Sequence, residues 1–187
     1  MYDWSPDGER LLLTRRGDDN HLAEIWLLPV GGATAPHTPA LQKIVSDPSY
    51  DLWQSRFSPD GRWIVFEAVR YSPKTESAIF VVPVAGGPWT RISKGEPWDD
   101  KPRWSPDGKT IYYVSGVGGF LNVWGIRFDP NNGKPLGEPF RVTAFEKPSL
   151  MVPDFIQYVG LSVTEDKLAI TVAEQSGSIW MLDNVDK

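Results

Sequence analysis

The chain has 187 residues, with 17 glycines, 17 prolines, nine tryptophans and a formal net charge of −5. This composition favours short strands joined by tight turns and leaves few windows for an amphipathic helix. The absence of cysteine excludes disulfides, thiolate catalysis and cysteine-ligated zinc. The acidic balance argues against nucleic acid as a partner, because phosphate binding needs a basic face. No apolar run is long enough to span a bilayer, so no membrane insertion is expected.

An aromatic residue followed by Ser-Pro-Asp-Gly occurs three times along the chain. Proline fixes φ at the second position of a tight turn, aspartate tolerates the third, and glycine supplies a positive φ. We therefore expect the aspartates to serve the turns, with no role in catalysis or metal binding. The turn residues are Ser5, Pro6, Asp7 and Gly8, then Ser58, Pro59, Asp60 and Gly61, and then Ser105, Pro106, Asp107 and Gly108.

Each turn is followed by an almost unbroken apolar run. These runs predict second strands that are buried on both faces, because a half-exposed strand would alternate between apolar and polar residues. A third apolar strand follows in each unit and ends in a glycine-rich turn. The second strands are 11–13, 63–66 and 111–114, and the third strands are 25–30, 79–84 and 123–128.

A fourth, more polar strand closes each of these three units, at 41–45, 89–93 and 139–143. Each of these strands carries a basic residue beside an aliphatic one, which is typical of an outer strand that faces solvent. The last unit, 160–170, replaces the turn motif with Thr164, Glu165 and Asp166. Its third strand is expected at 179–182, and nothing follows that could form a fourth strand.

The four units resemble the TolB-like, WD-like β-propeller repeats of bacterial proteins. The resemblance implies an all-β fold with four consecutive four-stranded antiparallel blades, the last one lacking its outer strand. We place the blades at about 2–46, 52–93, 100–143 and 157–185 of a partial propeller that covers 1–187. The chain begins inside a repeat, so we expect it to be part of a larger ring. The resemblance also favours a periplasmic or extracytoplasmic location.

An open arc of four blades would expose apolar blade faces. We therefore expect that such an arc either stays open or associates with a second copy that closes or covers it.

The loops opposite the Ser-Pro-Asp-Gly turns are longer and combine aromatic residues with carboxylates. Such a surface could bind a protein, a peptide or a small ligand. The simpler interpretation is that the aromatics cover blade ends and the acids cap turns. A cation site formed by the aspartates of this set is a weaker alternative. The candidate binding residues are Tyr50, Asp51, Trp53, Trp98, Asp99, Asp100, Asp154, Phe155 and Tyr158.

The sequence contains no catalytic constellation that we can identify. Its two histidines are His21 and His37, both in expected loops, and no Gly-x-Ser-x-Gly elbow is present. We expect no catalytic residue, no metal and no cofactor. The favoured function is a non-enzymatic propeller module that binds or senses a protein or peptide. The alternatives are the gating propeller of a prolyl-oligopeptidase-like serine peptidase, whose catalytic domain would lie elsewhere, and a purely structural scaffold.

Overall fold

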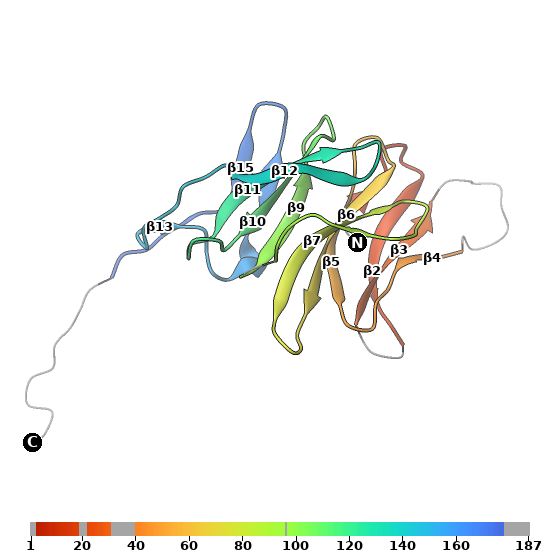
Figure 1. The fold of residues 1–187 in the computed structure, drawn as a ribbon, viewed down its shortest axis with the longest axis horizontal. Helices are drawn as coiled ribbons and strands as arrows, with labels where there is room; N and C mark the ends of the chain where they lie inside the picture. The colour runs from red at the N-terminus through yellow and green to blue at the C-terminus, as the bar shows by residue number, and fades with distance from the viewer. Residues whose placement is uncertain (1–2, 19–21, 31–39, 96, 178–187) are drawn as a thin grey trace, which may run out of the picture.

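A computed structural model describes residues 3–18, 22–30, 40–95 and 97–177. These residues form antiparallel sheets that stand side by side in an arc (Figure 1). The only helical element in these ranges is the short 3-10 turn η1 (Ile156–Tyr158). The all-β, partial-propeller fold predicted from the repeats is thereby confirmed. None of the described helical segments is long and apolar enough to cross a membrane.

Three sheets have four strands each and are called blades 1, 2 and 3. In each of them the strands pair in chain order. Blade 1 contains β1 (Asp3–Trp4), β2 (Arg10–Arg16), β3 (Ala23–Pro29) and β4 (Gln42–Val45). Blade 2 contains β5 (Asp51–Phe57), β6 (Trp63–Arg70), β7 (Glu76–Pro83) and β8 (Thr90–Arg91). Blade 3 contains β9 (Asp99–Trp104), β10 (Thr110–Ser115), β11 (Asn122–Asp129) and β12 (Lys134–Arg141).

The fourth unit is built differently within the described residues. The hairpin of β14 (Leu161–Val163) and β15 (Leu168–Ile170) surrounds the Thr164–Asp166 turn. A separate ladder joins β13 (Leu150–Met151) to β16 (Ala173–Glu174), and no repeat had indicated it. The third strand expected at 179–182 lies outside the described residues.

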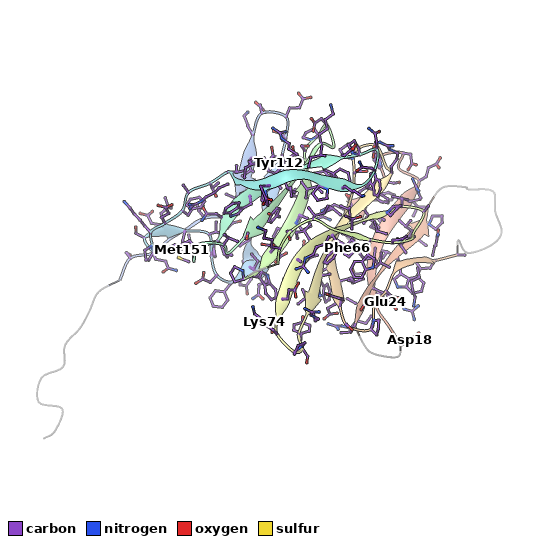
Figure 2. The ribbon with its side chains drawn as sticks, viewed as in Figure 1. Asp18, Glu24, Phe66, Lys74, Tyr112 and Met151 are labelled. Carbon is purple, nitrogen blue, oxygen red and sulfur yellow. The ribbon has the colours of Figure 1, made fainter. Side chains whose placement is uncertain are left out.

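The blades are held together by apolar layers between neighbouring sheets. Successive side chains of a strand point to opposite faces, so β6 sends Ile64 and Phe66 towards blade 1 and Val65 towards blade 3. Phe66 is fully buried and lies near the middle of the assembly (Figure 2). A third, smaller layer joins Val114 and Val123 of blade 3 to the fourth unit.

The prediction of burial on both faces holds for β6 and for most of β10, but it is wrong for β2. Only Leu12 is buried there, because within the described residues blade 1 has a neighbouring blade on one side alone. On its other face, Trp26 lies under the cations of Arg15 and Lys43, at 5.4 and 5.1 Å from the ring. Lys43 also pairs with Glu24 at 2.8 Å. Charged side chains therefore cover the indole on the open face.

The three Ser-Pro-Asp-Gly turns share one geometry. In the second turn, the Ser58 hydroxyl donates to the Asp60 carboxylate at 2.6 Å and accepts from the Trp63 backbone N–H at 2.9 Å. Burial alone would raise the pKa of Asp60, but the Ser58 hydrogen bond together with the backbone N–H and guanidinium of Arg62 lowers that pKa overall. Gly61 has a φ of +69°, which a side chain would strain.

Neighbouring turns also touch one another on one face of the arc. A Cβ at Gly61 would lie 3.6 Å from the ring of Pro6, and one at Gly108 would lie 3.5 Å from the ring of Pro59. The proline of one blade thus packs beside the glycine of the next. The motif therefore contributes to the contact between blades as well as to each hairpin.

Replacing Ser58 by alanine should lower the free energy of unfolding by about 1–2 kcal/mol, because the two hydrogen bonds of the buried Ser58 hydroxyl are lost. Urea denaturation measures the change. The matched control is Thr164→Ala, where the equivalent hydroxyl is exposed and its bonds to Asp166 and Lys167 are 3.1–3.3 Å long. The control should change stability by less than about 0.5 kcal/mol. Equal losses of stability in Ser58→Ala and Thr164→Ala would contradict the inference that the buried Ser58 hydroxyl stabilises its turn more than the exposed Thr164 hydroxyl does.

Candidate functional site

The first candidate binding residues lie at the joint between blades 1 and 2. Asp51 opens β5 and is only 5% exposed. Its carboxylate accepts a hydrogen bond from the Ala23 backbone N–H at 2.6 Å and lies 4.0 Å from a guanidinium nitrogen of Arg16. Arg16 also covers the half-buried ring of Trp53 at 5.5 Å. Asp51 and Trp53 therefore connect two blades.

Tyr50 packs in the same joint. Its ring makes edge-to-face contacts with Phe80 and Trp89, with ring centroids 6.2 and 5.7 Å apart. The Arg70 guanidinium lies 5.5 Å from its other side. This position closes the end of the apolar layer, as the simpler sequence interpretation expects.

Asp100 belongs to a buried polar cluster between blades 2 and 3. Asp100 is 3% exposed, and the ammonium of Lys101, which is also buried, lies 3.6 Å from it. Glu67 of β6 faces this pair and accepts a hydrogen bond from the Ser77 hydroxyl at 2.8 Å. Burial raises the pKa of Glu67 well above its ordinary value of 4.5. The neighbouring Asp100 carboxylate raises that pKa further, because the two groups interact by charge and by a hydrogen bond.

Glu67 was missed by the sequence reasoning. The signal that could have revealed it is its place in the otherwise apolar strand 63–69, where an acid has no solvent-facing side to occupy. An ionisable group in such a run indicates a buried polar cluster.

The first strands of blades 2 and 3, β5 and β9, carry a β-bulge at the same point. Gln54 and Lys101 each have a φ of 55°, which is uncommon for residues other than glycine. Each lies three residues before the aromatic of its turn motif, and the pairing shifts at that point in both blades. A bulge re-aims the neighbouring side chains, and the acids that precede it, Asp51 in β5 and Asp100 in β9, are buried.

A groove of about 410 Å³ lies on the loop face between blade 3 and the fourth unit. Of the predicted residues, Trp98 and Asp154 line it, and Phe155 and Tyr158 follow Asp154 in the chain. Both of these aromatics are 72% exposed. The remaining lining residues are small or apolar: Pro97, Gly116, Gly119, Leu121 and Ile156.

The groove carries unused hydrogen-bonding capacity. The indole N–H of Trp98 is buried, and it has no acceptor among the described residues. The groove is narrow between Gly116 and Pro97, because a Cβ added at Gly116 would lie only 3.0 Å from the Pro97 ring. These features suit a ligand with three groups. A carbonyl would accept from the unpaired indole N–H, an apolar group would contact the apolar lining, and a positive charge would lie near the exposed Asp154 carboxylate.

The predicted residues thus separate into two sets. Tyr50, Asp51, Trp53 and Asp100 lie in the joints between blades, whereas Trp98, Asp154, Phe155 and Tyr158 lie at or beside the groove. Asp99 is 2% exposed and faces a different hollow. The aspartates do not form a cation site, because no group of three potential metal ligands gathers within the described residues. His21 and His37 lie outside that part of the chain.

Comparisons with known proteins agree with the geometry. No known family profile matches the sequence. An uncharacterized protein of Agrobacterium fabrum is 33% identical over 125 residues, which are 67% of this chain and 39% of that protein. The chain therefore spans less than half of the length of that protein.

Two solved structures show the same fold. A candidate TolB from Agrobacterium tumefaciens matches with a TM-score of 0.59 and 22% identity, over 91% of this chain and 59% of that one. The β-propeller domain of the trilobed protease from Pyrococcus furiosus, described as having an open velcro topology, matches with a TM-score of 0.53 and 18% identity. That match covers 90% of this chain and 46% of that one. At these identities the likeness establishes the β-propeller fold alone.

The buried Glu67 should make stability depend on pH. Its raised pKa means that the folded state favours the neutral acid, so its contribution is complete below about 4.5 and declines as pH rises through the folded pKa. Glu67→Gln keeps a neutral group there. Its free energy of unfolding relative to wild type should therefore rise from pH 4.5 upwards, as followed by urea denaturation.

Glu76→Gln is the control of opposite sign. Arg91 and Arg70 lower the pKa of Glu76 against the effect of burial, so its contribution is present above the ordinary value and is lost as pH falls. This variant should become less stable than wild type as pH rises from acidic values. Parallel pH profiles for the two variants would contradict the assignment of Glu67.

Proposed function

We propose that this chain is a non-enzymatic binding module of a larger TolB-like propeller protein. In this proposal it binds an extended protein or peptide segment in the loop-face groove. The observation that carries the proposal is the buried, unpartnered indole N–H of Trp98 in an apolar groove beside Asp154. The donor would bind a backbone carbonyl of the segment, and the carboxylate would bind a lysine, an arginine or an N-terminal amine.

The exposed aromatics support this assignment. Phe155 and Tyr158 are each 72% exposed and flank Ile156, which lines the groove. Aromatic side chains that already stand in solvent gain the most from burial by a partner, and they are enriched among residues that dominate binding energy. The two rings would extend the contact beyond the groove itself.

A second candidate is the gating propeller of a serine peptidase. The β-propeller fold, which the chain shares with the propeller domain of the trilobed protease, is compatible with this candidate. The full open reading frame tests it, because this function requires an adjacent α/β-hydrolase domain with its own nucleophile. A reading frame without such a domain would remove this candidate.

The groove proposal can be tested with peptides selected from a displayed random library on the intact chain. We expect enriched peptides to combine a basic residue with an apolar one. Their affinity, measured by calorimetry, should fall about tenfold or more in Trp98→Phe, which keeps a ring but removes the N–H donor. The double variant Phe155→Ala, Tyr158→Ala should weaken binding by a similar factor while leaving the unfolding transition in place.

The matched control is Leu136→Ala on β12. Leu136 is 51% exposed and lies away from the groove, so this variant should bind the peptides as wild type does. Failure to enrich any peptide, or equal affinity in the groove variants and the control, would count against the proposal and favour a purely structural scaffold.

A further inference from the structure

A second hollow, separate from the loop-face groove, lies between blades 2 and 3. Its volume is about 220 Å³, and its walls come from Lys94 of the segment after β8 and from Asp99, Tyr113, Ser115, Trp124 and Glu138 of blade 3. The register explains why these blade 3 residues meet. Asp99 pairs with Ser115, and Tyr113 pairs with Trp124. Directly paired residues share a face, and this face is turned towards blade 2.

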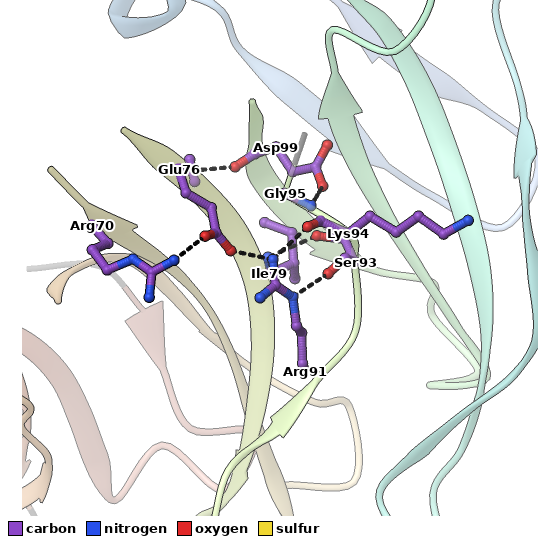
Figure 3. Close-up of polar contacts among 9 residues, drawn as sticks. Arg70, Glu76, Ile79, Arg91, Ser93, Lys94, Gly95 and Asp99 are labelled. Atoms are coloured by element: carbon purple, nitrogen blue, oxygen red, sulfur yellow. Dashed lines mark hydrogen bonds and ion pairs between the residues drawn. The ribbon is translucent and has the colours of Figure 1, made fainter. Parts of the chain in front are cut away.

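Asp99 carries one carboxylate oxygen that has no hydrogen-bond donor within the described residues. One carboxylate oxygen binds the Gly95 backbone N–H at 2.8 Å (Figure 3). The other oxygen, Oδ1, is buried and has no hydrogen-bond partner among the described residues. Burial raises the pKa of Asp99, and hydrogen bonds to its carboxylate from Ser115, Ser93 and the Gly95 backbone oppose that shift. A buried unpaired acceptor at 2% residue exposure needs an explanation.

Trp124 provides the complementary donor. Its indole N–H is also buried, and in the described part of the chain it has no acceptor. Tyr113 stands between these two groups in the register and is 3% exposed. Burial and the Asp99 charge both raise the pKa of its hydroxyl, so Tyr113 keeps its proton. The hollow therefore contains a carboxylate that can only accept and an indole that can only donate.

The loop that carries one wall is held in place. Arg91 donates to the carbonyl oxygens of Ser93, at 2.8 Å, and of Lys94, and it also pairs with Glu76 (Figure 3). Gly95 has a φ of +75°, and a Cβ there would lie 2.7 Å from that of Ala78. This ordering fixes the position of Asp99 before any ligand arrives.

We propose that this hollow binds a primary carboxamide, such as the side chain of asparagine or glutamine or a small free amide. Its NH₂ group would donate to Asp99 Oδ1, and its carbonyl would accept from the Trp124 N–H. An ammonium would leave the indole N–H unpaired, and a carboxylate would face Asp99 with like charge. The Lys94–Glu138 pair, 3.7 Å apart with both side chains more than four-fifths exposed, stands at the mouth. The site is independent of the loop-face groove.

The test uses the intact chain labelled with ¹⁵N and propionamide as the probe. The Trp124 indole resonance is identified by its loss in Trp124→Phe. Propionamide should shift it in a saturable way in the millimolar range, whereas propylamine and propionate should not. Asp99→Asn should abolish the shift. An asparagine whose oxygen keeps the bond from Gly95 turns its NH₂ towards the ligand, and this donor cannot accept from the NH₂ of propionamide. Glu138→Gln at the exposed mouth should retain it.

Saturation transfer from protein to propionamide gives a second readout that does not need the Trp124 signal. The transfer should be strong for wild type and Glu138→Gln and should be lost in Trp124→Phe. A dispersed spectrum of Trp124→Phe would show that this variant is still folded. Absence of any shift and transfer in wild type would mean that water alone fills the hollow and would overturn the proposal. An equal response to propylamine would overturn it in favour of a cation, and an equal response to 1-propanol in favour of a hydroxyl.

Discussion

The packing of one sheet against the next is the constraint on which this structure depends. Strands such as β6 carry apolar side chains on both faces, with Phe66 towards blade 1 and Val65 towards blade 3. A sheet with two apolar faces cannot be stable in water by itself, and its stability comes from its neighbours. The open face of blade 1 illustrates the same constraint, because Arg15 and Lys43 cover Trp26 where no described sheet does.

The fold could be predicted from the sequence because its signals are local. Ser58, Asp60 and Gly61 form a turn that is complete within a few residues, and the apolar run after it reports the two-sided burial of β6. Asp99 and Asp100 could not be placed in this way. Two acids after Pro97 look like a solvated loop, whereas the structure makes them the buried start of an inner strand. The bulge at Lys101 has no sequence signal. Lysine has no local preference for a positive φ, so this conformation depends on the packing of blade 3 against blade 2.

The two hollows are a consequence of strand alternation at one point. Trp98 and Asp99 are consecutive, so they point to opposite faces of blade 3. Trp98 lines the groove beside the fourth unit, and Asp99 lines the hollow beside blade 2. From the sequence the two residues were expected on one surface, because they are adjacent in the chain. The direction in which each side chain points depends on where the strand begins, which the sequence does not show. The candidate site was therefore predicted in its residue types and only partly in its arrangement.

The arginines that end the outer strands of blades 2 and 3 affect how another chain can associate with them. Arg91 occupies the carbonyls of Ser93 and Lys94, and Arg141 does the same for Thr143 and Phe145. Exposed carbonyls at the edge of a sheet are the template on which a foreign strand adds. These carbonyls follow β8 and β12 in the chain, so an internal guanidinium occupies acceptors just beyond the ends of the two outer strands. A foreign strand that paired along β8 or β12 and continued past its end would therefore find these acceptors already in use.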